Sequence, residues 1–159
     1  MLLDLAFARA FPNNGVMLTR NNIRLTLKGA RAILAAAESK ANAMRVPMNI
    51  AIVDEGAHLL VFARMDGVKI SSIAVAMTKA VSASLRRTAS GPTPSAADPN
   101  LILTIGLSFA TNGNLTGIRG GLPLFVEGQC VGAIGVSGGT EDEDVQVAQA
   151  GVDAMAGLS

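Results

Sequence analysis

Apolar residues recur along the chain at regular spacings, and these spacings predict most of the helices. Steps of three and four residues predict a first helix that begins at the N-cap Thr26 and ends at Pro47. Similar steps predict a second helix over 70–86 and a last helix behind a capping box at Thr140. The stretch 101–109 is apolar at nearly every position, so its pattern fits either a short helix or a strand.

Two pairs of apolar segments, each joined by a short turn, predict two β-hairpins. The first hairpin spans residues 48–64, and the second spans residues 122–136. Neither hairpin belongs to a βαβ unit, so we predict an α/β domain of the α+β type: a central, mostly antiparallel sheet of two hairpins with helices packed on it. This single domain covers residues 25–159, and residues 1–24 precede it as a tail.

Composition narrows the classes of partner. The chain has 13 basic and 12 acidic residues and neither Trp nor Tyr, which argues against a nucleic-acid-binding protein. Half of the residues are hydrophobic and only 16% are charged, so we expect a homo-oligomer that covers apolar surface between copies. No apolar run reaches the ~20 residues of a membrane span, and we expect no membrane partner.

Cysteine usage and the first residues bear on the compartment. Cys130 is the only cysteine, which excludes an intrachain disulfide, and its apolar neighbours predict a buried, inert thiol. The first residues carry no basic segment of the kind that opens a secretory signal. We therefore expect a cytoplasmic protein.

Four ionisable side chains are candidates for chemistry. His58 is the only histidine, which excludes a multi-histidine metal site; it is either an axial haem ligand or a half-exposed residue at the start of a strand. Lys79 lies among small residues, so it is either a desolvated binding or catalytic amine or a lysine at the helix edge. Arg64 and Asp66 flank the end of the first hairpin, where they either anchor an acidic substrate or form an ordinary ion pair.

Glycine gathers in the second half of the chain, where nine of the 17 glycines lie between Gly113 and Gly139. Such repetition within strands indicates close approach of the backbone to a helix or to a ligand. Gly138-Gly139 precede a helix and could cradle a phosphate, but the four carboxylates of that helix's first turn would repel it. Helix–sheet packing is the better explanation of these glycines.

The order and spacing of four segments resemble the GlcG/HbpS-like family of haem-degrading proteins. The segments are LTLKGARAILAAAESKA, NIAIVDEGAHLLVFARMDG, IAVAMTKAVSAS and GGLPLFVEGQCVGAIGVSGGTEDEDVQVAQAG, and together they cover roughly residues 25–155. The resemblance implies a compact domain with an antiparallel sheet, assembly into oligomers, and binding of small ligands such as haem. The positions that match the family pattern are His58, Arg64, Met65, Asp66, Lys79, Gly120, Gly121, Gly138 and Gly139.

Two functions follow from the residues and the resemblance together. In the first, an oligomeric small-molecule-binding protein holds haem or a related tetrapyrrole in a cleft near the 88–121 loop. The ligand-binding residues would be His58, Phe109, Thr111, Asn112, Gly120, Gly121, Gly138 and Gly139.

In the second, the protein is a cofactor-free isomerase, lyase or hydrolase that acts on a small carbonyl or carboxylate metabolite. Lys79 and Arg64 would then bind or polarise the substrate, with Asp66 or Asp54 as the base. The loop over 88–118 favours a ligand smaller than haem, because Phe109 is its only aromatic residue.

Overall fold

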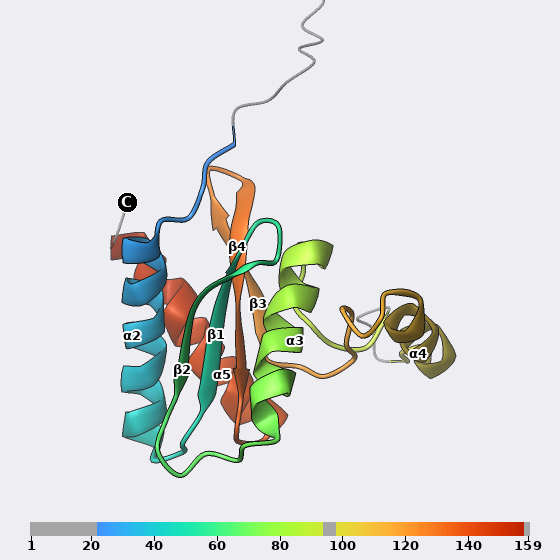
Figure 1. The fold of residues 1–159 in the computed structure, drawn as a ribbon, viewed down its shortest axis with the longest axis horizontal. Helices are drawn as coiled ribbons and strands as arrows, with labels where there is room; N and C mark the ends of the chain where they lie inside the picture. The colour runs from blue at the N-terminus through green and yellow to red at the C-terminus, as the bar shows by residue number, and fades with distance from the viewer. Residues whose placement is uncertain (1–21, 94–97, 158–159) are drawn as a thin grey trace, which may run out of the picture.

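A single four-stranded sheet organises the chain in the computed structural model, which describes residues 22–93 and 98–157. Its strands run in the order β2-β1-β4-β3, and every neighbouring pair is antiparallel (Figure 1). The central pair, β1 and β4, joins the two predicted hairpins into one sheet. The strand bounds are β1 Asn49–Asp54, β2 Leu59–Arg64, β3 Gly121–Val126 and β4 Gln129–Ser137.

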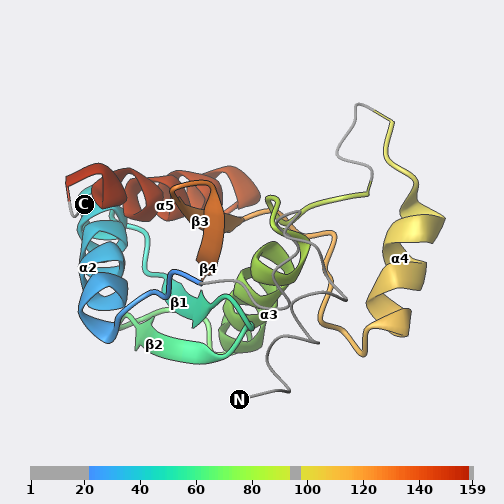
Figure 2. The same cartoon turned by 90° about the horizontal axis from the view of Figure 1, so that it is seen from above.

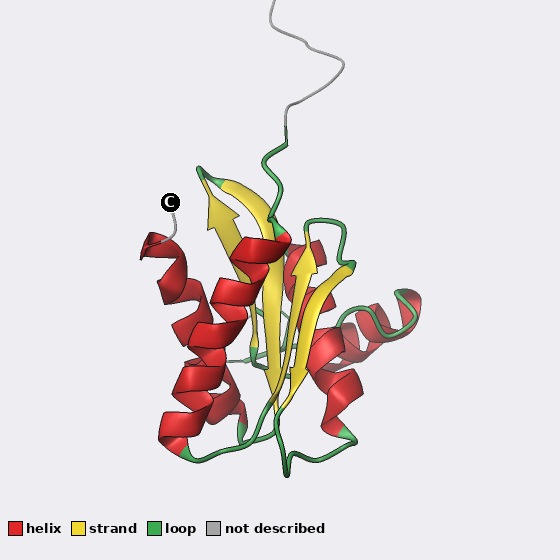
Figure 3. Cartoon of the chain, turned by 60° about the vertical axis from the view of Figure 1, so that its left-hand side comes forward, coloured by secondary structure: helices red, strands yellow, loops and turns green. Residues whose placement is uncertain are grey.

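Helices cover both faces of the sheet, which confirms the predicted α+β fold (Figure 3). One face carries α2 and α5, and the other carries α3. A further helix, α4, stands away from the sheet beside the α3 layer (Figure 2). The helix bounds are α2 Leu27–Met44, α3 Ser72–Arg86, α4 Leu101–Ala110 and α5 Glu141–Asp153, with a 3₁₀ turn at Ala154–Gly157.

Side-chain size separates the two faces of the sheet. Because side chains alternate along a strand, Ile50 and Ile52 of β1 point into the core under α2 and α5. Ala51 and Val53 face α3, whose inner side presents small residues. Gly135 lies against the backbone of α3 so closely that a Cβ there would overlap the carbonyl of Ala76. This contact confirms helix–sheet packing as a reason for the glycines.

Local signals in the sequence place the element ends. Thr26 caps α2 through its hydroxyl, and Thr140 forms the full capping box at α5. At the second hairpin, Glu127 and Gly128 both have positive φ angles, 49° and 75°, as a type I′ turn requires. In the first hairpin, Asp54 accepts the backbone N–H groups of the turn instead.

Three details extend or correct the sequence predictions. The ambiguous stretch 101–109 is a helix that continues to Ala110. The second helix starts at Ser72 rather than residue 70, because the preceding residues form a turn whose backbone hydrogen bonds join residues three positions apart. Of the predicted tail, residues 1–21 lie outside the described residues. No helix in the described ranges is long and apolar enough to cross a membrane.

Candidate functional site

A cavity of about 450 Å³ lies at the end of the sheet where both hairpins turn. The β1–β2 turn contributes Glu55, the β3–β4 hairpin contributes Phe125 and Cys130, and the end of α3 contributes Arg87. Its lining combines an aromatic ring, a cation, a carboxylate and a thiol. The remaining lining residues are Asn22, Ile23, Gly128 and Gln129.

Arg87 supplies the positive charge of this cavity. It caps the C-terminus of α3 in the left-handed conformation, with φ 55°, where the 88–121 loop begins. Glu55 is already paired with Arg24 at 3.1 Å, whereas Arg87 forms no ion pair with another described residue. The Arg87 guanidinium is therefore free to bind an anionic group.

His58 belongs to the same β1–β2 turn as Glu55. Asp54 shapes this turn, because its Oδ1 accepts the backbone N–H groups of Gly56 at 2.9 Å and His58 at 2.8 Å. The same oxygen lies 3.3 Å from the imidazole Nδ1 of His58, which leaves Nε2 as the nitrogen available to a ligand. The His58 side chain is 83% exposed.

Cys130 differs from its prediction as a buried, inert thiol. It is only half-buried, its Sγ lies 3.4 Å from the carbonyl of Gly132, and it lines the cavity. Cys130 pairs with Phe125 beyond a register shift between Leu124 and Phe125, and the apolar pattern of the strand does not reveal such a shift.

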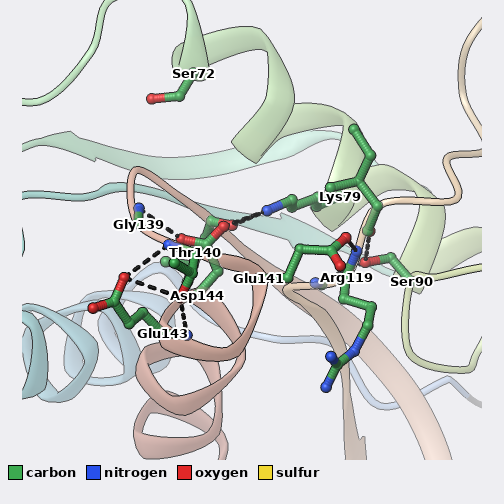
Figure 4. A network of polar contacts seen from close by, with 12 residues as sticks. Ser72, Lys79, Ser90, Arg119, Gly139, Thr140, Glu141, Glu143 and Asp144 are labelled. Atoms are coloured by element: carbon green, nitrogen blue, oxygen red, sulfur yellow. Dashed lines mark hydrogen bonds and ion pairs between the residues drawn. The ribbon is translucent and has the colours of Figure 1, made fainter.

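Lys79 is desolvated, as one of its two predicted environments requires, but the carboxylate that it binds belongs to its own chain. Its side chain is 1% exposed, and its Nζ donates to Asp144 Oδ2 at 2.6 Å and to the carbonyl of Val136 at 2.9 Å (Figure 4). Asp144 in turn accepts the backbone N–H of Gly139 through Oδ1, at 3.1 Å. The pair therefore links α3, β4 and α5 in the interior. Asp144 was not singled out in the sequence, where it is one of four carboxylates in a helix's first turn.

The glycines that we predicted to bind a ligand lie close against other atoms of the protein, two of them beside Lys79. Gly120, with φ 120°, lies where a Cβ would come within 3.0 Å of the Lys79 Nζ. A Cβ at Gly121 would overlap the Lys79 carbonyl, and one at Gly138 would overlap the Pro47 carbonyl. Protein atoms thus fill the space beside these glycines, so their proposed role in ligand binding gains no support from the geometry.

Arg64 and Asp66 are placed apart from Lys79. Arg64 ends the edge strand β2, at the far end from His58. Asp66 lines a second, open cavity of about 410 Å³ beside the C-terminus of α2. Lys79, Arg64 and Asp66 therefore do not share one site in the structure. The cofactor-free enzyme remains a prediction.

Phe109, Thr111 and Asn112 lie at the end of α4 and in the turn after it. The Thr111 hydroxyl donates to the carbonyl of Leu107 at 2.7 Å, and Asn112 has a φ of 51°. None of the three lines the cavity at the hairpin turns. No described residue of the 88–121 loop lines this cavity, and Arg87 directly precedes the loop, so the cleft near that loop stays a prediction.

Comparison with known proteins places the chain among relatives of the same fold. It is 34% identical to protein GlcG of Escherichia coli over 74% of this chain and 84% of GlcG. The crystal structure of Klebsiella pneumoniae protein ORFY superposes with a TM-score of 0.79 at 30% identity, over 91% of this chain and all of that one.

A second solved structure, that of a PduOC–haem complex, superposes with a TM-score of 0.72 at 28% identity. That match covers 83% of this chain and 95% of PduOC. The sequence model of the family described as haem degrading protein HbpS-like matches residues 25–153, which contain the whole sheet and α2 to α5. The chain therefore belongs to the HbpS-like family.

Proposed function

We propose that the cavity at the hairpin turns binds haem or a related tetrapyrrole. Its volume of about 450 Å³ falls in the range of small-molecule sites, which is about 300–1,000 Å³. The family match and the likeness to PduOC, a protein solved with haem, support this ligand class. The observation that carries the proposal is that Arg87, which pairs with no other described residue, lines one cavity with Glu55 of the turn that bears the chain's only histidine.

The residues present fit the chemistry of haem. Haem is flat and apolar with two carboxylates at one edge, and a protein typically holds its iron through an imidazole. Phe125 offers a ring to the flat face, and Arg87 offers a bidentate cation to a propionate. His58 does not line the cavity itself but lies three residues after Glu55 on the same turn, and its Nε2 would be the iron ligand, since Asp54 already engages the other ring nitrogen.

We further propose that the working form is a homo-oligomer in the cytoplasm. Eleven large apolar side chains in the described ranges are exposed in the isolated chain, which favours their burial between copies. The mass of the protein in solution tests the homo-oligomer, and a hemin titration tests the haem site, so each proposal has its own test.

The test is a hemin titration followed by absorption spectroscopy. Because the chain lacks Trp and Tyr, a bound chromophore stands out against a nearly transparent protein. We expect the wild type to saturate with a sharp Soret band at a fixed ratio to the chain. We expect His58→Ala to lose the band's ligand-field signature, and Arg87→Ala to bind hemin about tenfold more weakly, as expected for the loss of one charge-assisted contact.

Arg31→Ala is the matched control, because Arg31 is an exposed arginine on α2, outside the cavity. Its titration should coincide with that of the wild type. Non-saturating adsorption of hemin to the wild type would contradict haem binding altogether. Saturable binding that His58→Ala and Arg87→Ala leave unchanged would place the haem elsewhere on the chain.

A further inference from the structure

Residues 22–24, which lead into α2, form one wall of the cavity at the hairpin turns. Asn22 and Ile23 line this cavity, and Figure 1 shows the segment, in blue, passing the tip of the β3–β4 hairpin. Ile23 is fixed by two contacts: its N–H donates to Gln129 Oε1 at 3.3 Å, and its side chain packs against the core under α2 and α5. The wall therefore holds the next residue, Arg24, at the rim of the cavity.

The guanidinium of Arg24 ends against a carboxylate of the cavity wall. Its Nε lies 3.1 Å from Oε1 of Glu55, and Glu55 lines the cavity. The Arg24 side chain is 78% exposed, whereas the Glu55 side chain is 25% exposed. Because most of the arginine side chain lies in solvent, it can turn from Glu55 to another anion without any change in the core.

The cavity and its rim thus bring together two arginines and one carboxylate. Arg87 forms no ion pair with another described residue, and Arg24 is paired with Glu55. A ligand with a single carboxylate would be matched by Arg87 and would leave the ion pair intact. A ligand with two carboxylates needs a second cation, and Arg24 already contacts the cavity wall.

We propose that Arg24 exchanges Glu55 for a carboxylate of the ligand when the cavity is filled. Arg87 binds one carboxylate of the ligand, and Arg24 leaves Glu55 to bind the other. This inference rests on the proposed tetrapyrrole site and names what that site selects. The preferred ligand is flat and carries two free carboxylates, in contrast to one whose acids are esterified or amidated. Glu55 neutralises Arg24 as long as no such ligand is bound.

The exchange of partners is favourable because the ion pair that it breaks is weak. A pair with one largely exposed member typically contributes a factor of about five or less to an equilibrium constant. A bidentate contact between arginine and a ligand carboxylate contributes roughly tenfold to affinity. After the exchange, Glu55 keeps contact with water, since its side chain is partly exposed. The second carboxylate therefore gains affinity even though Glu55 loses its partner.

Two substitutions that remove one charge each test the exchange by hemin titration. Glu55→Gln keeps the size of the side chain but forms no ion pair, so Arg24 is available before the ligand arrives. We expect this variant to bind hemin about three- to fivefold more tightly than the wild type. Arg24→Gln removes the second cation, and we expect its affinity for hemin to be about threefold lower. Absorption spectroscopy gives both dissociation constants, and circular dichroism checks that each variant folds.

A matched variant and a matched ligand serve as controls. Glu127→Gln makes the same change at an exposed carboxylate of the neighbouring β3–β4 turn, which does not line the cavity, and should bind hemin like the wild type. The dimethyl ester of hemin keeps the ring and the iron but lacks both free carboxylates. We expect the wild type, Glu55→Gln and Arg24→Gln to bind this ester with the same affinity.

The remaining outcomes separate this inference from the proposed haem site. Saturable hemin binding that Arg24→Gln leaves unchanged would overturn the exchange, whatever Glu55→Gln does, and would leave the haem site intact. Weaker binding by Glu55→Gln would make Glu55 a support of the turn and would also overturn it. Equal shifts with hemin and its ester would show that the ligand carboxylates are not involved. Non-saturating adsorption of hemin to the wild type would contradict the haem site and this inference together.

Discussion

The surroundings of Lys79 and the helix α4 differ in how their side chains are buried: the Lys79 side chain is fully buried and paired, whereas no side chain of α4 is buried. Around Lys79, a buried charge finds an acid, a carbonyl and a cradle of glycines, all within one chain. At α4, ten residues without a charge find no burial in that chain. The comparison teaches that the sheet with α2, α3 and α5 buries its charge and its core within one chain, whereas α4 leaves its large apolar side chains exposed.

Breaking the ion pair should produce the largest effect. Lys79→Met leaves Asp144 charged and buried without a counter-ion, which typically costs 3–5 kcal/mol, so we expect a loss of about that size in the free energy of unfolding. Urea unfolding followed by circular dichroism measures it. The double variant Lys79→Met with Asp144→Leu should recover much of the loss, because no uncompensated charge remains. Equal losses in both variants would contradict the buried-pair explanation.

Glycine-to-alanine substitutions beside Lys79 and within α4 should have opposite effects on stability. Gly121→Ala would drive a Cβ into the Lys79 carbonyl, so we expect a loss of about 1–3 kcal/mol. Gly106→Ala, in the middle of α4, meets no atom within 4 Å, and alanine favours a helix by up to about 1 kcal/mol. Unfolding curves of the two variants should therefore shift in opposite directions. A similar destabilisation by both would mean that α4 is packed as tightly as the sheet.

Local signals explain which parts of the fold could be predicted from sequence. The capping box at Thr140, the cap at Thr26 and the Glu127-Gly128 turn each lie within a few residues, so they specify their structure without distant partners. The hairpins follow from apolar segments joined by short turns, which are signals of the same local kind. Pairing of β1 with β4 needed the structure, because the two strands are far apart in the sequence.

The candidate site was harder to predict because it depends on distant partners. Lys79 and Asp144 are 65 positions apart, and nothing near Lys79 in sequence distinguishes a buried pair from a free amine. Likewise, Arg87 faces a cavity formed by two hairpin turns, and only the fold brings them together. The stretch 101–109 stayed ambiguous for the opposite reason: with no core of its own chain to face, it carries no periodic pattern.

Amide hydrogen exchange on the assembled wild type and on Ile70→Lys tests the central contrast most directly. The substitution lies outside α4, so in the proposed homo-oligomer it would reach this helix only through a contact with a second copy. We expect the α4 amides to be protected in the wild type and to exchange several times faster in the variant. Amides of β1, β4 and α3 should keep their protection in both. If α4 exchanged alike in the two proteins, or the sheet lost protection together with it, the contrast between a core buried within one chain and an apolar helix covered only in the homo-oligomer would be wrong.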